Sequence, residues 1–348
     1  LKTRKVKGTS DYIEYLMSLA YAGKKENDLA LKHINKAIEI NPSNPTYRLH
    51  KATVLASLKK YNDSLKELSL IQNTGNKQFD RNVKIQEYFV LSEKNKQQPA
   101  GNIHLARYYM LKGEYQTARN LLQKSIKEKA NNTQIYTLLG DISYELKEFD
   151  QARKEYEIAL RYDRKNIKAT IGLANTKFVE GKFKESLNLY QQALKADPNS
   201  LDIMLKIAEN YKMLAEEEQA YKYYNRILSK NSSNVDAIYN LAVINDTIGE
   251  TDKAVEQLKK SLSIDPMHAE SWIHLTNIQL KRNNSFLARI YLTPVGHINK
   301  NIPEYHYYLG LINKNIENYT EARKNFQRAL ELNPGFTKAA TELDKLKQ

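Results

Sequence analysis

Histidine is the residue type in this sequence best suited to hold a metal ion or move a proton, and four of the seven histidines lie close together late in the chain. They are His268, His274, His297 and His306. A zinc site needs its ligands to converge at about 2 Å from the metal, but these four fall at unrelated positions of the internal repeat described below. We therefore expect no metal site. The lack of cysteine also excludes disulfides and thiolate ligands.

Motifs for nucleophilic catalysis or phosphate binding are weak. The run "SLKK" (57–60) has a Ser-x-x-Lys spacing, but no companion motif accompanies it. The sequence has no glycine-rich phosphate loop, and no Ser/His/Asp arrangement stands apart from the repeat pattern. We therefore predict a non-catalytic protein that needs no cofactor.

Positive charge is concentrated in the N-terminal third. The formal net charge is +14; residues 1–130 hold 24 Lys and Arg against 12 Asp and Glu, whereas residues 131–348 hold 30 against 28. Such an excess attracts anionic partners. The expected basic patch consists of Lys2, Arg4, Lys5, Lys7, Arg81 and Lys84. An acidic protein, an anionic membrane surface and nucleic acid are the partners that this charge leaves open, in that order of preference, beside a plain solvated face.

The elements that carry these residues follow an internal repeat. The stretches "FKESLNLYQQALKADPNS" (183–200), "TDKAVEQLKKSLSIDPMH" (251–268) and "YTEARKNFQRALELNPGF" (319–336) place small, apolar, small and proline residues at the same spacing, 68 residues apart. Copies between them halve that period to 34: Ala152/Tyr156/Ala159, Ala220/Tyr224/Ile227 and Ala288/Leu292/Val295. An apolar-then-small pair recurs upstream of each, as in Leu139-Gly140 and Leu173-Ala174. The small residues let helices approach closely, and the proline ends the second helix.

This pattern resembles the tetratricopeptide repeat, a unit of two antiparallel helices with a 34-residue period. The resemblance implies an all-α, right-handed α-solenoid of about nine such units, because one unit cannot bury its apolar face alone. We predict two units in residues 11–78 and seven in 99–336, after a basic lead in 1–10. Between them, residues 79–98 break the period and contain one amphipathic stretch, Val83 to Leu91, which predicts an inserted helix or hinge. Residues 337–348 are expected to form a capping helix.

The resemblance also implies a concave groove lined by the first helix of each unit. Carried onto this sequence, its partner-binding positions are Tyr144, Phe178, Tyr239, Val243, Ile273, Asn277, Leu280, Tyr307 and Leu311. From residue 235 onward the set is mostly apolar, which favours an amphipathic or extended peptide. Packing against neighbouring helices is the equally weighted alternative. A clamp for a C-terminal carboxylate is not expected, because Ile171 and Ile273 stand where that clamp needs lysine.

The stretch "YLTPVGHINK" (291–300) is expected to be a local defect in the repeat. Pro294 lacks an N–H and Gly296 weakens a helix, so we predict that this helix kinks or ends early. The usual closing proline is replaced by Lys300, and the next unit begins at Pro303.

These observations together predict a scaffold that binds protein or peptide partners, one of them acidic, and assembles a larger complex. No run is long and apolar enough to span a bilayer, and both the cytoplasm and a bacterial periplasm stay open as compartments. The chain opens with Leu1, so a mature or trimmed form is expected. A composition rich in Lys, Asn, Ile and Tyr indicates an AT-rich bacterium, where such scaffolds serve envelope, secretion or motility assemblies.

Overall fold

The computed structural model describes residues 7–128 and 132–346, with side chains from Asp11 onward, and all twenty elements in these ranges are α-helices. The all-α expectation is confirmed. The chain divides into two compact units, residues 1–181 and 182–348. None of the described helices is long and apolar enough to cross a membrane.

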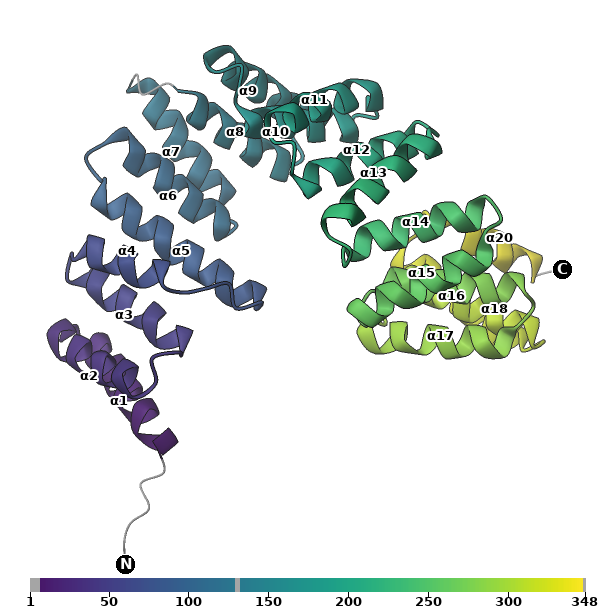
Figure 1. Ribbon diagram of the computed structural model, residues 1–348, viewed down its shortest axis with the longest axis horizontal. Helices are drawn as coiled ribbons and strands as arrows, with labels where there is room; N and C mark the ends of the chain where they lie inside the picture. Colours follow the sequence, from purple (N-terminus) through teal and green to yellow (C-terminus); the bar gives the residue numbers. More distant parts are fainter. Residues whose placement is uncertain (1–6, 129–131, 347–348) are drawn as a thin grey trace, which may run out of the picture. The chain divides into compact units, whose positions relative to one another are not determined.

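The first unit contains ten helices that follow one another as helical hairpins (Figure 1). Their bounds are α1 Lys7–Gly23, α2 Asn27–Ile40, α3 Pro45–Ser57, α4 Tyr61–Ser69, α5 Lys77–Lys94, α6 Pro99–Leu111, α7 Tyr115–Lys127, α8 Thr133–Glu145, α9 Phe149–Tyr162 and α10 Ile167–Val179.

The second unit continues the same alternation of helix and short turn. Its helices are α11 Phe183–Ala196, α12 Leu201–Met213, α13 Glu217–Lys230, α14 Val235–Thr247, α15 Thr251–Ile264, α16 Ala269–Lys281, α17 Ser285–Ile298, α18 Pro303–Asn315, α19 Tyr319–Leu332 and α20 Thr337–Lys345.

The turn inside each hairpin is set by one residue in the left-handed backbone conformation. After α8, Lys147 has φ 62°, and the N–H of Glu148 reaches back to the Ser143 carbonyl at 2.9 Å. This is the Schellman arrangement, which satisfies carbonyls left open at a helix C-terminus. The residues with positive φ at this turn are Lys25, Lys59, Gly113, Lys147, Gly181, Ala215, Gly249, Asn283 and Glu317. From Gly113 onward they recur every 34 residues.

The turn between hairpins is fixed by Asn and Asp side chains. Five residues just after a second helix accept the N–H two residues further on, at 2.8–3.1 Å. They are Asp163, Asn231, Asp265, Asn299 and Asn333. Helices α9, α13 and α17 end in the same frame as α15 and α19 although no proline follows them. Proline therefore accompanies this stop but is not required for it.

Glycine and aromatic residues interlock in the core. A Cβ on Gly140 or Gly172 would come within 2.6 or 2.3 Å of the Tyr156 ring, so this ring packs directly against the backbones of α8 and α10. Gly310 gives the same access to Phe326. These contacts agree with the predicted use of small residues for close helix approach.

The predicted interruption between the early units is a complete helix. Whereas the sequence indicated an amphipathic stretch over 83–91, α5 runs from Lys77 to Lys94 and packs against α4 and α6. Helix α4 has only nine residues where α2 has fourteen. The shortened helix leaves a cavity of about 640 Å³ between α4 and α5, lined largely by aliphatic side chains. A hinge at this place stays a prediction.

The expectation that the helix containing Pro294 ends early is wrong. Helix α17 continues to Ile298 and has fourteen residues, as α13 and α15 do. Gly296 is buried, and a Cβ there would lie 2.8 Å from the hydroxyl oxygen of Tyr305 in α18. Gly296 thus serves a helix–helix contact, and that packing holds the last turn in place.

Candidate functional site

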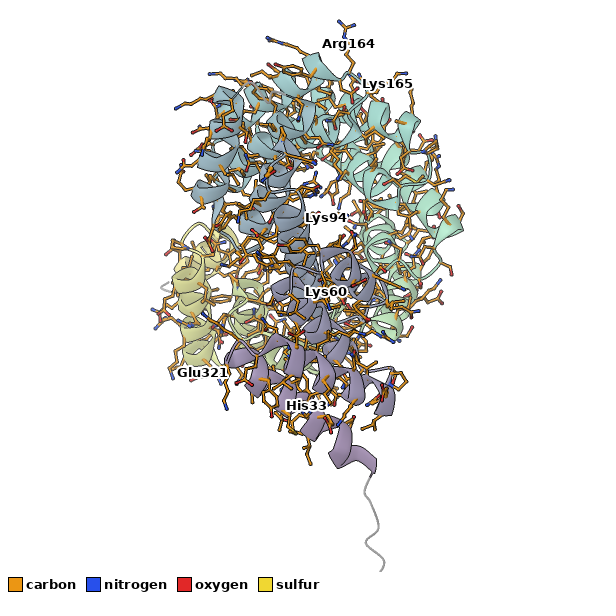
Figure 2. All side chains as sticks on the ribbon, turned by 90° about the vertical axis from the view of Figure 1, so that its left-hand side faces the viewer. His33, Lys60, Lys94, Arg164, Lys165 and Glu321 are labelled. Carbon is orange, nitrogen blue, oxygen red and sulfur yellow. The ribbon has the colours of Figure 1, made fainter. Side chains whose placement is uncertain are left out.

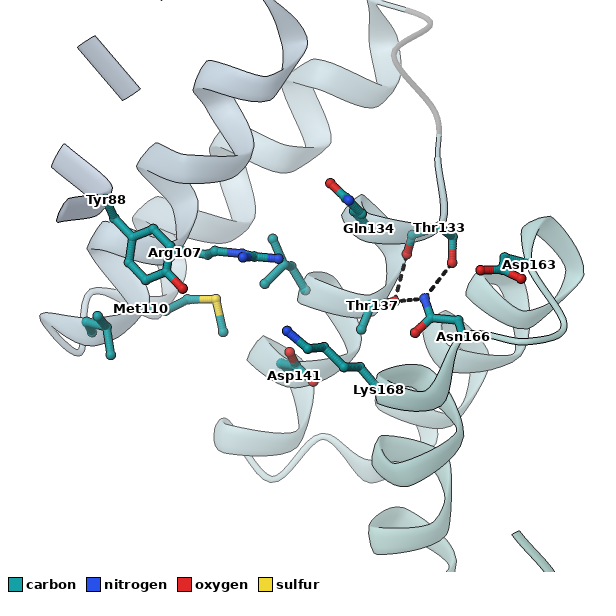
Figure 3. Close-up of a pocket in the computed structure, with 12 residues that line it drawn as sticks. Tyr88, Arg107, Met110, Thr133, Gln134, Thr137, Asp141, Asp163, Asn166 and Lys168 are labelled. Carbon is teal, nitrogen blue, oxygen red and sulfur yellow. Dashed lines mark hydrogen bonds between the residues drawn. The ribbon is translucent and has the colours of Figure 1, made fainter. Parts of the chain in front are cut away.

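The best-formed cavity of the first unit lies where α6, α8 and α10 face the same space, and its volume is about 480 Å³ (Figure 3). Helix α8 presents one face to it, because Gln134, Thr137 and Asp141 are three and four residues apart. The other lining residues come from α5, α6, the turn after α9 and α10: Tyr88, Arg107, Met110, Leu111, Thr133, Leu138, Asp163, Asn166 and Lys168.

One wall of the cavity is a closed hydrogen-bond network. The Asn166 amide nitrogen donates to the hydroxyl oxygens of Thr133 at 2.7 Å and Thr137 at 3.0 Å (Figure 3). The Asn166 carbonyl oxygen accepts the N–H of Ala169 at 3.1 Å and so caps α10. Because every polar atom of the Asn166 amide has a partner, this wall is rigid and offers a ligand little free hydrogen-bonding capacity.

Two cations face the middle of the cavity from different helices. Arg107 of α6 and Lys168 of α10 point toward one another across it (Figure 3), and the Arg107 guanidinium carbon lies 5.7 Å from the centre of the Tyr88 ring. Among the described residues neither cation has a carboxylate within ion-pairing distance. Most cations of this chain that lie near a carboxylate are paired, so these two stand out as charges available to a ligand.

Asp141 is the acidic group at the centre of the cavity. Its carboxylate accepts a 2.8 Å hydrogen bond from the Tyr156 hydroxyl. Burial raises the pKa of Asp141, although the Tyr156 hydrogen bond and the positive charges of Lys168 and Arg107 oppose that rise. Burial next to this carboxylate also raises the pKa of Tyr156. The second acidic residue of the lining, Asp163, is exposed at the edge and accepts the N–H of Lys165.

A smaller cavity of about 370 Å³ lies in the second unit, between α14, α16 and α18. Its floor is aromatic and aliphatic, with Tyr239 and Ile273 among the lining residues, and exposed Glu270 and Glu304 are its carboxylates. Burial lowers the pKa of His274, and the nearby Asp246 opposes this change. In contrast to the cavity of the first unit, this one favours an apolar side chain or a cation.

The nine groove residues expected from the sequence are all half-buried, and none is fully exposed. Two of them, Tyr239 and Ile273, line the cavity of the second unit. Packing accounts for much of the surface of others: Ile273 and Leu280 lie against the core around Leu292, and the Tyr307 ring lies 5.2 Å from Phe336. The structure brings no cavity to Tyr144, Phe178, Val243, Asn277 or Leu311 among those described.

The sequence did not single out Arg107 and Lys168. Arg107 is one of many cations in the basic third, and Lys168 lies outside that third. The available signal was their common frame, because both belong to first helices of the repeat and lie on the face that Asp141 also occupies.

The expected basic patch is only partly formed. Lys2, Arg4 and Lys5 lie outside the described residues, as does the side chain of Lys7. Arg81 donates to the Leu111 carbonyl at the end of α6, and Lys84 forms a 2.7 Å ion pair with Glu87.

The late histidines have separate structural roles. His268 caps α16 by accepting the N–H of Ser271, His274 lies 3.3 Å from an Asp246 oxygen, and His306 hydrogen-bonds the Lys300 carbonyl. His297 is exposed in the last turn of α17.

Family models described as tetratricopeptide repeat match five stretches of this chain: residues 15–44, 109–175, 177–242, 235–268 and 303–336. These stretches fall on the helical hairpins of both units and avoid α5. No curated protein matches the chain in sequence.

Solved structures show the same fold at low sequence identity. A tetratricopeptide repeat protein from Parabacteroides merdae is 18% identical with a TM-score of 0.62, and the match covers 72% of this chain and 99% of that one. The APC/C hetero-tetramer Cut9–Hcn1 gives 14% and 0.58, with 97% and 76% covered. Yeast Tom70 gives 13% and 0.50, with 97% and 89% covered. The hairpins, their 34-residue turns and these matches agree: the chain belongs to the tetratricopeptide repeat family.

Proposed function

We propose that this protein is a non-catalytic scaffold that holds protein partners in a larger assembly, and that the cavity of its first unit anchors an acidic side chain of a partner. The observation that carries the proposal is the pair Arg107 and Lys168, which face one cavity from two helices without an ion pair. A carboxylate entering between them would gain charge-assisted hydrogen bonds in a partly enclosed place. Asp141 would exclude a second carboxylate from the same space.

The wider setting is part of the same proposal. Cut9 is seen in complex with Hcn1 in a hetero-tetramer, which supports the use of this fold in assembly. A bacterial envelope, secretion or motility apparatus is the assembly that we propose, on the strength of the amino-acid composition.

The test is a double substitution with a matched control. Arg107→Ala with Lys168→Ala removes both cavity cations. Arg164→Ala with Lys165→Ala removes two cations from the exposed turn between α9 and α10, where both side chains point away from the helices (Figure 2). Binding is measured with a library of fluorescent peptides, each acidic member paired with its Glu→Gln and Asp→Asn counterpart. We expect the cavity variant to lose about tenfold or more in affinity for the acidic peptides that bind, since a charged hydrogen bond is worth about 1.5–3 kcal/mol.

The control variant should bind those peptides as the unchanged protein does, and the amide counterparts should bind weakly to all three. Equal binding by the cavity variant would contradict the anchor. Affinity that depends steeply on salt, follows nucleic acid and survives the cavity substitutions would favour the alternative of a nucleic-acid-binding repeat protein.

A further inference from the structure

Helix α1 has apolar residues on both of its faces. Its inner face is used by the fold: the buried Ser18 hydroxyl donates to the Ala30 carbonyl at 2.7 Å, and Tyr15 packs against Tyr47 of α3. Its outer face is covered by none of the described residues, with five large apolar side chains that are 38–54% exposed: Tyr12, Ile13, Leu16, Met17 and Leu19. A helix that is apolar all round normally has both faces buried.

The acidic side chains of α1 are committed to the interior. Asp11 accepts hydrogen bonds from the Asn41 amide at 3.1 Å and the Tyr47 hydroxyl at 3.2 Å. Glu14 lies 2.6 Å from Nδ1 of His33 in α2 (Figure 2) and 3.7 Å from the Lys36 ammonium. Neither carboxylate therefore belongs to the outer face, which carries no charge along its length.

Positive charge stands at both ends of this uncharged face. Lys24 and Lys25 follow α1 directly and are exposed. In the sequence, Lys2, Arg4, Lys5 and Lys7 come immediately before the first of the exposed apolar residues. The outer face of α1 thus combines an apolar strip with basic flanks, the combination by which helices lie at the surface of anionic bilayers.

The last helix provides a contrast within the same chain. Helix α20 buries Ala339, and its exposed positions include Lys338, Thr341 and Lys345. Such a polar outer face ends a helical array in water without a further partner. The apolar strip on α1 is therefore not a general property of the outer helices of this fold.

We propose that the outer face of α1 binds the surface of an anionic lipid bilayer, with Tyr12, Leu16 and Leu19 in the interfacial region and the flanking lysines and arginine on lipid phosphates. The absence of acidic side chains from the face favours this occupant. A second copy of the chain would bring the same lysines together, which like-charge repulsion opposes.

The test measures co-sedimentation of the full chain with phosphatidylcholine vesicles, with and without phosphatidylglycerol. We expect binding to the anionic vesicles that weakens with salt. Leu16→Glu with Leu19→Glu should lower it at least about tenfold, because two charges would enter the interface. The matched control is Ile248→Glu with Phe286→Glu, which adds the same charge at positions 60% and 75% exposed in the second unit. It should bind as the unchanged protein does.

A second pair of variants tests the basic flank. Lys2, Arg4, Lys5 and Lys7, all changed to Ser, should bind anionic vesicles more weakly than a variant with Lys59, Lys60, Arg164 and Lys165 changed to Ser. Lack of binding to anionic vesicles would overturn the proposal, as would equal binding by the Leu16/Leu19 variant. Sedimentation of the lipid-free chain as a dimer that the Leu16/Leu19 changes dissociate would instead identify a protein interface. The Arg107/Lys168 variant should bind vesicles normally, so failure of the cavity anchor and failure of membrane binding are distinguishable.

Discussion

At the scale of single residues, Tyr156 links the core of the first unit to its cavity. Its ring fills the space that Gly140 and Gly172 leave, and its hydroxyl holds the Asp141 carboxylate at 2.8 Å. The same side chain therefore fixes the approach of α8 to α10 and the direction of the one acidic group at the centre of the cavity. A buried carboxylate with few partners costs folding free energy when it is charged.

The first residue-scale prediction concerns Asp141→Asn. Because burial raises the pKa of Asp141 above its unfolded value, the folded state holds the proton more tightly. The free energy of unfolding must then fall as pH rises from the unfolded pKa through the folded pKa. At pH 7 the unchanged protein bears the full cost of the charge, and asparagine bears none while still accepting the Tyr156 hydrogen bond. We expect the variant to be the more stable at pH 7 in urea unfolding.

The advantage of this variant should shrink as pH is lowered toward the unfolded pKa, where Asp141 is neutral in both states. Asp163→Asn is the matched control, because Asp163 lines the same cavity but is exposed. A variant that is less stable than the unchanged protein at pH 7 would show that Lys168 and Arg107 stabilise the charge more than burial opposes it.

At the scale of elements, the turn inside each hairpin uses one conformation with different residue types. Gly113, Gly181 and Gly249 adopt positive φ with little strain, whereas Lys147, Ala215 and Glu317 hold the same place with a side chain. For an ordinary L-residue the left-handed region costs about 1–2 kcal/mol. The fold therefore tolerates a small strain at several turns, because the Schellman hydrogen bonds keep the geometry.

This strain gives a prediction at two turns of the second unit. Ala215→Gly should raise the free energy of unfolding by up to about 1 kcal/mol, because the strain removed exceeds the entropy cost of glycine. Gly249→Ala should lower it by about 1 kcal/mol, and nothing lies within 4 Å of the added Cβ, so the effect would come from the backbone alone. Thermal and urea unfolding measure both. A stabilising Gly249→Ala would contradict the argument.

The elements were predictable where many copies carry the same pattern. The spacing of Ala152, Tyr156 and Ala159 and of their counterparts was enough to place both helices of each unit, since the same small and aromatic residues must meet in every copy. The break before Pro99 was also readable, and it corresponds to α5. The left-handed turn residues carried a signal in Gly113, Gly181 and Gly249, which are 34 residues apart.

Features that depend on contacts between elements were not predictable from one sequence. Gly296 reads as a weak point in a helix, and only the position of the Tyr305 ring shows that it serves packing. The cavity of the first unit needs Arg107 and Lys168, 61 positions apart in sequence, to face one space. Their types are common, and the repeat pattern does not distinguish a paired lysine from an unpaired one. Half-burial of Tyr307 likewise depends on Phe336, which a helix-by-helix reading does not bring near.

At the scale of the whole molecule, stability is a sum of neighbour contacts. Each helix packs against those next to it in sequence, and contacts reach no further than a helix or two along the chain. The chain also divides into two compact units. In such an array a local defect should weaken its neighbours without unfolding distant repeats.

The matching prediction uses one buried leucine from each unit. Leu122 of α7 and Leu258 of α15 are both fully buried, each in the core cluster of its own unit. Either Leu→Ala substitution should cost about 2–5 kcal/mol by lost burial and a residual cavity. We expect Leu122→Ala to speed amide hydrogen exchange in α6–α9 while α14–α19 keep their protection, and Leu258→Ala to do the reverse. Because the two changes are chemically identical, a difference in where exchange rises can come only from position. Uniform acceleration along the chain by either variant would mean that the units unfold as one, and the additive account of the array would fail.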